Sequence, residues 1–428
     1  MDTVAASDQE IRERRKSTIT CDMEGVIETF NVGAELMFGY SRDETIGKLR
    51  VSVFSPGEVV LQNLKTWLTT AVKEGEWVGE TNFIRKNGEL FGARIRITPT
   101  WREGVQIGFC GVTEELDQPV DVPISTGTKA LRWLVITRAP FLTAALTPIV
   151  IGLVWAGSIL GVSVPWLEAT LTFLGVALLH LASNVLNDYF DVKSGTDAAN
   201  TKYFVQYSGG SRAVEMRLID LEGTKRVGLA LVAAAMIIGL VLFTMVGSGV
   251  LVLGLTGLAI GYFYTAPPLR LVARRGLGEL SIGMAFGPLI TLGVGYVMTG
   301  AYHVEAFLAG IPAGLLTANI LLINQIPDAE GDAVTGKNHL VVTFGPKAAA
   351  GIYTIILTCA LASLSILAVV WDKPMMHIAT GIGVLYGAWI VRWLFSHLYD
   401  RTLVKANVAT INLQILVTVA MALLMGLT

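Results

Sequence analysis

The stretch that decides the fold lies at residues 184–191 and reads Asn-Val-Leu-Asn-Asp-Tyr-Phe-Asp. It follows a long apolar run, so its carboxylates lie in or beside an apolar layer. Carboxylates there are costly unless they are paired or bound to cations, which makes them functional candidates. On an ideal helix Asn184, Asn187, Asp188 and Asp191 fall within an arc of about 100°, because residues three and four apart share a face. The stretch therefore predicts one polar helix face.

A second polar stretch repeats this arrangement far along the chain. Asn324, Asp328 and Asp332 are spaced at i, i+4 and i+8, again after a long apolar run. Two facing sets of hard oxygen ligands suit Mg²⁺, which uses few carboxylates and completes its shell with water and substrate phosphate. The pair of clusters predicts a diphosphate held by metal at a membrane surface.

Composition indicates a soluble module followed by a membrane body. The 428 residues are 53% hydrophobic and only 15% charged, with a mean hydropathy of +0.58, as in polytopic membrane proteins. Residues 1–128 hold 14 Lys and Arg against 20 Asp and Glu, whereas residues 129–428 hold 18 against 14. The charged residues are thus concentrated in the shorter, N-terminal part.

Apolar runs of about 20 residues, the length needed to cross a bilayer, recur from residue 139 onward. We expect nine spans, at about 139–161, 165–186, 227–246, 249–266, 279–299, 305–326, 348–370, 375–396 and 406–427. With the N-terminus in the cytosol, the inner loops carry fourteen Lys and Arg and the outer loops only Lys373. This asymmetry fits the positive-inside rule. It predicts a multi-pass protein of the cell inner (plasma) membrane with both acidic clusters on the cytoplasmic face.

The membrane body resembles the UbiA-type intramembrane aromatic prenyltransferases, which have nine transmembrane helices and two Asp-rich motifs. The resemblance covers about residues 130–428. It rests on the two acidic clusters and on three further stretches, 208–212 (Ser-Gly-Gly-Ser-Arg), 264–270 with 276–279, and 336–345. Any one stretch alone would be weak, but their order and topological positions together are specific.

Within that family, the chain looks most like the 1,4-dihydroxy-2-naphthoate polyprenyltransferases of menaquinone synthesis. Five residues separate Asp191 from Asp197, whereas the hydroxybenzoate branch leaves three. The Tyr-Phe-Asp string and the Gly-Gly-Ser-Arg stretch point the same way. One departure is that Asn338 and His339 follow Lys337, where that branch often has Arg-Thr.

The resemblance implies Mg²⁺-dependent transfer of a polyprenyl group from its diphosphate to an aromatic acceptor. The implied metal and diphosphate ligands are the five aspartates Asp188, Asp191, Asp197, Asp328 and Asp332, of which all but Asp197 are assigned a catalytic role. The implied substrate contacts are Asn184, Asn187, Lys193, Arg212, Arg270, Asn324 and Lys337. His180, one turn before Asn184, is more simply read as a packed or hydrogen-bonded residue than as a catalytic one.

Other functions remain open at this level. The membrane body could be a non-catalytic sensor or receptor that keeps a prenyl-lipid site, or it could prenylate hydroxybenzoate, homogentisate or a glycerol phosphate lipid. A transporter is disfavoured because the acidic groups lie at helix ends and not near the midplane. We expect a lipid bilayer as surroundings and no nucleic-acid partner.

Residues 17–116 read as an α+β module. Apolar alternation at 26–31, strand patterns at 81–86, 91–99 and 105–112, and a hairpin signal at Asn87-Gly88 predict a sheet with a helix near Ala34. The strings at 31–41, 44–48, 85–88 and 108–112 resemble a PAS domain, which implies ligand sensing or homodimerisation. We therefore divide the chain into a tail (1–16), the PAS-like domain (17–116), a linker (117–130) and the membrane domain (131–428).

Overall fold

The computed structural model of the protein describes residues 16–204 and 207–427. The chain forms two compact units. The first consists of Met1–Ile136 together with Arg212–Asp220, and the second of Thr137–Ser211 together with Leu221–Thr428. A short internal piece, residues 212–220, is therefore part of the first unit although it lies between two segments of the second.

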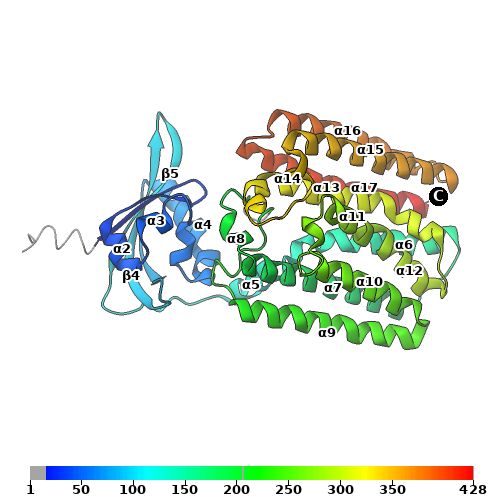
Figure 1. Cartoon of the computed structure of the whole chain (residues 1–428), viewed down its shortest axis with the longest axis horizontal. Helices are drawn as coiled ribbons and strands as arrows, with labels where there is room; N and C mark the ends of the chain where they lie inside the picture. Colours follow the sequence, from blue (N-terminus) through cyan, green and yellow to red (C-terminus); the bar gives the residue numbers. More distant parts are fainter. Residues whose placement is uncertain (1–15, 205–206, 428) are drawn as a thin grey trace, which may run out of the picture. The chain divides into compact units, whose positions relative to one another are not determined.

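The first unit is built on a five-stranded antiparallel sheet in the order β2-β1-β5-β4-β3 (Figure 1). The strands are β1 (Lys16–Asp22), β2 (Ile27–Phe30), β3 (Trp77–Ile84), β4 (Leu90–Arg102) and β5 (Val105–Glu115). The expected hairpin is present, with Ile84 opposite Leu90 and Gly88 in the left-handed region at φ +91°. Gly88 meets this requirement without a Cβ penalty.

Short helices and one long helix complete this unit. They are α2 (Val32–Phe38), α3 (Arg42–Thr45) and α4 (Gly57–Glu74). Asn31 caps α2 by accepting a hydrogen bond from the backbone N–H of Ala34 at 2.8 Å. Phe38 stacks on Phe54 with ring centroids 4.3 Å apart, inside a buried cluster of aromatic and aliphatic side chains. The expected helix near Ala34 is confirmed, whereas α4 carries no expectation from the sequence.

The segment expected to be a linker is anchored to the first unit. The backbone of Val120 exchanges two hydrogen bonds with the side chain of Asn82. A helix, α5 (Thr126–Thr137), follows, and its Thr128 hydroxyl donates to the Gln62 side chain of α4 at 2.9 Å. Arg132 of α5 pairs with Glu58 of α4 at 3.0 Å. The stretch is therefore a docked segment ending in a helix.

The second unit is all helical. Within the described residues, eight helical segments are long and apolar enough to cross a membrane, and α10 (Gly249–Phe263) is a shorter apolar helix. Figure 1 shows them side by side. The eight are Ala139–Ile159 (containing α6), α7 (Trp166–Lys193), α9 (Leu221–Val246), Leu277–Thr299 (α11 and α12), α13 (Val304–Val334), α15 (Pro346–Val370), α16 (Met376–Ser396) and Arg401–Leu427 (containing α17). All nine expected spans are thus helices, and the fourth falls short of full length.

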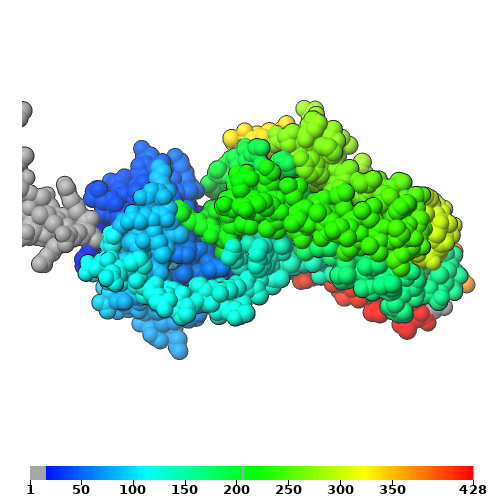
Figure 2. All heavy atoms as spheres, turned by 90° about the horizontal axis from the view of Figure 1, so that it is seen from below, coloured from blue at the N-terminus to red at the C-terminus, as the bar shows by residue number. Residues whose placement is uncertain are grey.

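Helix α13 forms the centre of this unit, whereas α9 lies along its outside. The most apolar 18-residue window of α13 is 72% buried and that of α9 only 6%. In Figure 2 the green spheres of α9 accordingly run along the visible face. Gly310 and Gly314 let the π-helical turn Ala285–Leu289 approach closely, because a Cβ on Gly310 would lie 2.4 Å from the Gly287 carbonyl carbon and one on Gly314 3.0 Å from Pro288 Cδ. Small residues of this kind permit close helix packing in membranes.

Candidate active site

Both acidic clusters lie at the C-terminal ends of long helices, as the spacing predicts. Asp188 and Asp191 are on the last turns of α7, and Asp328 and Asp332 on the last turns of α13. Asp188, Asp191 and Asp332 are buried. A helix C-terminus carries partial negative charge, so these carboxylates need cations or N–H donors nearby.

Asp188 receives such partners from two segments. The guanidinium of Arg138, just before the first span, lies 4.0 Å from its Oδ1, and the backbone N–H of Ser211 donates to the same oxygen at 3.3 Å. The other carboxylate oxygen, Oδ2, is buried and has no hydrogen-bond partner among the described residues. Asp188 therefore presents one oxygen for a further ligand.

The glycine at 210 is required by the way this loop approaches the carboxylates. Gly210 has φ +78°, and a Cβ there would lie 2.9 Å from Asp188 Oδ1 and 3.7 Å from Asp197 Oδ1. Asp197, on the short helix α8 (Thr196–Ala199), is thereby placed on the same side of the loop as Asp188. Any larger residue would press on the carboxylate as well as strain the backbone.

The same loop also contacts the second cluster. The N–H of Gly209 donates to Asp328 Oδ2 at 2.9 Å, and the side chain of Asn200 donates to Asp328 Oδ1 at 2.7 Å. Gly331 of α13 permits this contact, because a Cβ there would lie 2.6 Å from the Cα of Asn200. The segment after α7 therefore ties the two clusters together.

Lys337 bridges the clusters directly. Its Nζ lies 2.8 Å from Asp191 Oδ1 and 3.8 Å from Asp332 Oδ1, and all three side chains are buried. Burial acts to lower the pKa of Lys337, but the facing carboxylates outweigh it and raise the pKa above its ordinary value. The ammonium is therefore charged at neutral pH and holds the two motifs together.

His339 supports Asp332 from its other side. Nε2 of the fully buried imidazole lies 3.0 Å from Asp332 Oδ2, and Nδ1 accepts from the Val342 N–H at 3.4 Å. Because Nδ1 accepts, the proton of the neutral ring is assigned to Nε2, which donates to the carboxylate. This is the histidine at which the sequence departs from the dihydroxynaphthoate branch.

The remaining expected residues divide into two groups. Asn184 donates to the Thr137 carbonyl at 3.2 Å, Asn324 accepts from Asn407 at 2.8 Å, and the side-chain oxygen of Asn187 has no hydrogen-bond partner among the described residues. These three line a common cavity. Three expected cations do not line this cavity. Lys193 lies over the Tyr189 ring, Arg270 donates to the Thr335 carbonyl, and Arg212 pairs with Glu215 inside the first unit.

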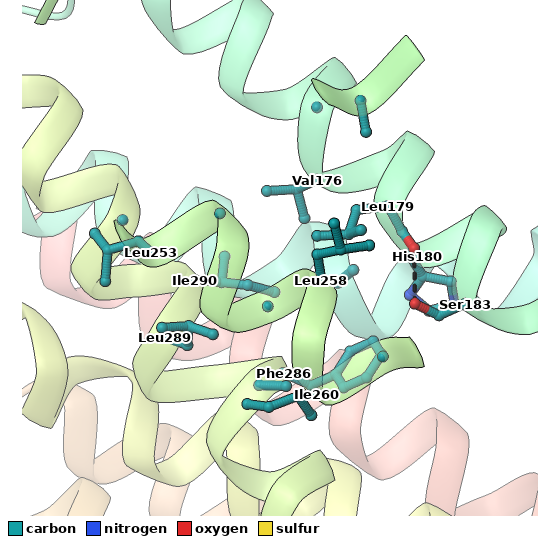
Figure 3. A pocket seen from close by; sticks show the side chains of 18 of the residues that line it. Val176, Leu179, His180, Ser183, Leu253, Leu258, Ile260, Phe286, Leu289 and Ile290 are labelled. Carbon is teal, nitrogen blue, oxygen red and sulfur yellow. Dashed lines mark hydrogen bonds between the residues drawn. The ribbon is translucent and has the colours of Figure 1, made fainter. Parts of the chain in front are cut away.

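A cavity of about 530 Å³ extends from the clusters into the helical unit. Along α7 its lining runs from Thr172 to Asn187, a rise of roughly 22 Å. Figure 3 shows that most of the labelled side chains are aliphatic. The labelled exceptions are His180, Ser183 and Phe286. Arg138, Asn184, Asn187 and Asn324 also line it, so one end is polar. Arg138 at this end pairs with Asp188, whereas the five aspartates themselves are not among the lining residues.

The donor set at that end suits a hard cation. Carboxylate and amide oxygens are available, and those of Asp188 and Asn187 named above lack hydrogen-bond partners. In residues 16–204 and 207–427, no three His, Cys, Asp or Glu side chains converge into a metal cage of their own. Mg²⁺ does not require one, since it keeps several waters and takes substrate phosphate oxygens. The residues therefore fit Mg²⁺ bound together with a phosphate ligand.

Three contributors to this site were not found from the sequence. Arg138 looks like any cation flanking a first span, and Asn200 like an ordinary turn residue. His339 stood out only as a departure from a family pattern. Arg138 and Asn200 act across 50 and 128 residues of sequence, which no local periodicity reports, whereas His339 lies only seven residues after Asp332.

Comparison with known proteins identifies the family of each unit. Residues 145–416 match the model of the UbiA prenyltransferase family, which is more than half of the chain. The chain belongs to the UbiA prenyltransferase family. Its N-terminal residues 15–115 match a PAS domain model. Both resemblances seen in the sequence are thereby confirmed.

Named relatives of this UbiA-family protein include two octaprenyltransferases. It is 29% identical over 214 residues to "1,4-dihydroxy-2-naphthoate octaprenyltransferase" of Bacillus subtilis (strain 168), covering 50% of this chain and 66% of that one. It is 28% identical over 244 residues to the protein of the same name from Escherichia coli (strain K12), covering 54% and 77%. The chain thus spans just under two thirds of the Bacillus protein's length.

Solved structures show the fold. A UbiA homolog from Archaeoglobus fulgidus bound to GPP and Mg²⁺ matches with a TM-score of 0.50 at 15% identity, covering 68% of this chain and 99% of that one. The apo UbiA homolog from Aeropyrum pernix K1 matches with a TM-score of 0.52 at 16% identity, covering 64% and 96%. The membrane unit therefore has the UbiA fold.

Proposed function

We propose that the protein transfers a prenyl group from a prenyl diphosphate to an aromatic acceptor in an Mg²⁺-dependent reaction. The observation that carries this proposal is the convergence of two acidic helix ends, bridged by Lys337, at the polar end of a long apolar cavity. A prenyl diphosphate has the same polarity, with a charged head and an apolar tail. The five cluster aspartates would hold the head through Mg²⁺, and the cavity would take the tail.

The chain's own groups have distinct tasks in this reaction. Lys337 supplies a fixed positive charge for phosphate oxygens, and the N–H groups of Gly209 and Ser211 hold Asp328 and Asp188 in place. Bound Mg²⁺ would act as a Lewis acid that stabilises the leaving diphosphate. The apolar walls exclude water, which would otherwise capture the allylic cation.

The reaction balances without any oxidant or reductant. The bond between the first prenyl carbon and the diphosphate oxygen breaks, and its electron pair leaves with diphosphate. A nucleophilic ring carbon of the acceptor then forms a bond to the allylic cation. The ring regains aromaticity by releasing the group which that carbon carried.

The acceptor that we propose is a dihydroxynaphthoate. The names of the Bacillus and Escherichia relatives support this choice, as do the spacing from Asp191 to Asp197 and the Gly-Gly-Ser-Arg stretch. We further propose that the clusters face the cytoplasm of a bacterial cell, on the charge asymmetry of the loops.

A turnover assay tests the proposal. Purified full-length protein in lipid, with Mg²⁺ and geranylgeranyl diphosphate, would be offered 1,4-dihydroxy-2-naphthoate, 4-hydroxybenzoate, homogentisate and glycerol phosphate. We expect prenylated dihydroxynaphthoate as the main product and none with EDTA. Product from another acceptor alone would contradict the acceptor assignment, and no product from any of them would favour a non-catalytic prenyl-lipid receptor.

We also propose that the PAS domain regulates this reaction through helix α4. Within the first unit, α4 begins against the segment 212–220: a Cβ on Gly57 would lie 2.1 Å from the Met216 carbonyl oxygen and 2.6 Å from Leu218 Cδ2. Leu218 is buried there, and Arg217 donates to the Tyr40 hydroxyl at 3.5 Å. Helix α4 therefore binds this segment as well as α5.

Both segments continue covalently into the candidate active site. Segment 212–220 follows directly on Gly209 and Ser211, whose N–H groups hold Asp328 and Asp188. Helix α5 leads into Thr137, whose carbonyl accepts from Asn184, and then into Arg138, which pairs with Asp188. A shift of α4 would thus move both segments and, through the covalent chain, the groups that contact Asp188 and Asp328. The PAS domain and the candidate active site would not need to bind the same ligand.

The substitution Gly57→Ala tests this link in the full-length protein. Its Cβ would displace residues 216–218, so we expect the KM for prenyl diphosphate to change at least threefold. Gly111→Ala in β5 is the matched control, because its Cβ would make only ordinary contacts, with Ile95 Cδ1 at 3.6 Å and the Ile19 carbonyl oxygen at 4.0 Å. Equal kinetics for both variants and the parent protein would contradict regulation through α4. Homodimerisation through the PAS domain remains a prediction of the resemblance.

A further inference from the structure

His180 lies on the wall of the cavity with an unusual lack of hydrogen bonds. The side chain is more than nine-tenths buried, and neither ring nitrogen has a hydrogen-bond partner in the described part of the chain. Figure 3 shows it among the side chains that line the cavity. Buried polar atoms are normally hydrogen-bonded, so two such atoms on one ring need an explanation.

The ring is held in place by packing alone. Phe286 meets it edge to face, with centroids 5.0 Å apart and planes at 88°. Phe286 is on the π-helical turn Ala285–Leu289, which interrupts the helix beside Pro288. Such turns occur frequently at functional sites. The turn presents an aromatic face next to an imidazole whose hydrogen-bonding capacity is unused.

The position of His180 relates it to the diphosphate site. His180, Asn184 and Asp188 are four residues apart on α7, so they share one face of the helix. The helical rise places His180 about 12 Å from Asp188 along the axis, on the apolar side. The diphosphate head, the first prenyl carbon and an aromatic ring, placed one after another, would fill the distance between Asp188 and His180.

From this geometry we infer that His180 binds a hydroxyl group of the aromatic acceptor, with Phe286 packing beside the acceptor ring. An uncharged imidazole can accept a hydrogen bond from a phenolic O–H through one nitrogen and donate through the other. The prenyl tail has no polar atoms, and the diphosphate is taken by the clusters. A hydroxylated aromatic ring is the reactant left to satisfy His180, and in this respect the inference rests on the proposed function.

Direct binding separates this inference from the transferase proposal. Purified full-length protein, with and without a prenyl thiolodiphosphate, would be titrated calorimetrically with 1,4-dihydroxy-2-naphthoate and with 2-naphthoate, which lacks both hydroxyls. We expect the parent protein to prefer the hydroxylated probe about tenfold, in the range of one hydrogen bond. His180→Phe should lose this preference, and His180→Gln should keep part of it.

The matched control is His377→Phe, since His377 is an exposed histidine on α16 outside the cavity lining. It should keep the full preference for the hydroxylated probe. In turnover assays, His180→Phe should raise the acceptor KM about tenfold and leave the prenyl diphosphate KM within twofold. The inference is overturned if the parent protein does not discriminate between the probes, or if His180→Phe discriminates equally well. Binding with discrimination but without turnover would contradict only the transferase proposal.

Discussion

The Nζ of Lys337 lies 2.8 Å from Oδ1 of Asp191, so the loop after α13 supplies a cation to the acidic cluster that ends α7. The same ammonium faces Asp332 at 3.8 Å. Lys337 thus connects the two acidic clusters through its charge, and the loop 209–211 connects them through backbone hydrogen bonds. It holds two helix ends together that would otherwise repel each other.

Lys337→Met should destabilise the protein most when Mg²⁺ is absent. Removing one partner of a buried ion pair leaves uncompensated carboxylates and typically costs about 3–5 kcal/mol. Added Mg²⁺ should therefore raise the thermal midpoint of the variant more than that of the parent protein, as measured by thermal unfolding in detergent. Lys373→Met, in the loop between α15 and α16, is the control and should leave both midpoints unchanged. Equal Mg²⁺ responses would argue against the bridging role.

Asp188→Asn and Asp328→Asn should each reduce prenyl transfer at least about 100-fold, the scale on which one electrostatic contact to the transition state acts. Neither change should prevent membrane insertion, because each replaces an acid by an amide of equal size. Glu330→Gln is the matched control on α13, since Glu330 is exposed and pairs with Lys202 at 2.7 Å. Initial rates of prenyl transfer would be measured for the three variants and for the parent protein. A comparable loss in Glu330→Gln would mean that charge near the helix end, and not the specific site, matters.

Gly210→Ala should abolish most activity while leaving the helical unit folded. The added methyl would press on Asp188 Oδ1 and occupy a backbone conformation at φ +78° that L-residues rarely adopt. Gly239→Ala on α9, where a Cβ would meet nothing within 4 Å, should retain full activity. Prenyl transfer rates and circular dichroism would be compared. Full activity in Gly210→Ala would contradict the role of loop 209–211 in positioning the carboxylates for prenyl transfer.

His339→Gln should raise the Mg²⁺ concentration needed for half-maximal activity by about tenfold. Residues that orient metal-binding carboxylates typically affect metal affinity by about 10- to 100-fold. His339 donates to Asp332 and caps the short helix α14 (Leu340–Phe344), so the thermal midpoint should be measured alongside. A lowered midpoint with an unchanged Mg²⁺ requirement would show that His339 acts only in folding.

The membrane helices and most of the sheet could be predicted from the sequence because their patterns are local. Apolar runs of about 20 residues indicate the membrane helices, and the charge asymmetry of the loops indicates their direction. The spacing from Asn184 to Asp191 indicates a helix with one polar face. Helix α4 was missed although its sequence carries a helical signal, because Val60, Leu64, Trp67, Leu68 and Ala71 recur at the spacing of one helix face.

What the sequence by itself determined is which residue types lie at the two acidic helix ends, because helix periodicity alone places Asp188 with Asp191 and Asp328 with Asp332. Only the tertiary structure decided that Lys337 and Gly209–Ser211 join those ends, that His339 supports Asp332, and that Arg212 belongs to the PAS-containing unit instead. It also showed His180 without hydrogen-bond partners in the described residues of the cavity wall. These relationships depend on contacts between residues that are distant in sequence, and such contacts are set by packing and charge compensation in three dimensions.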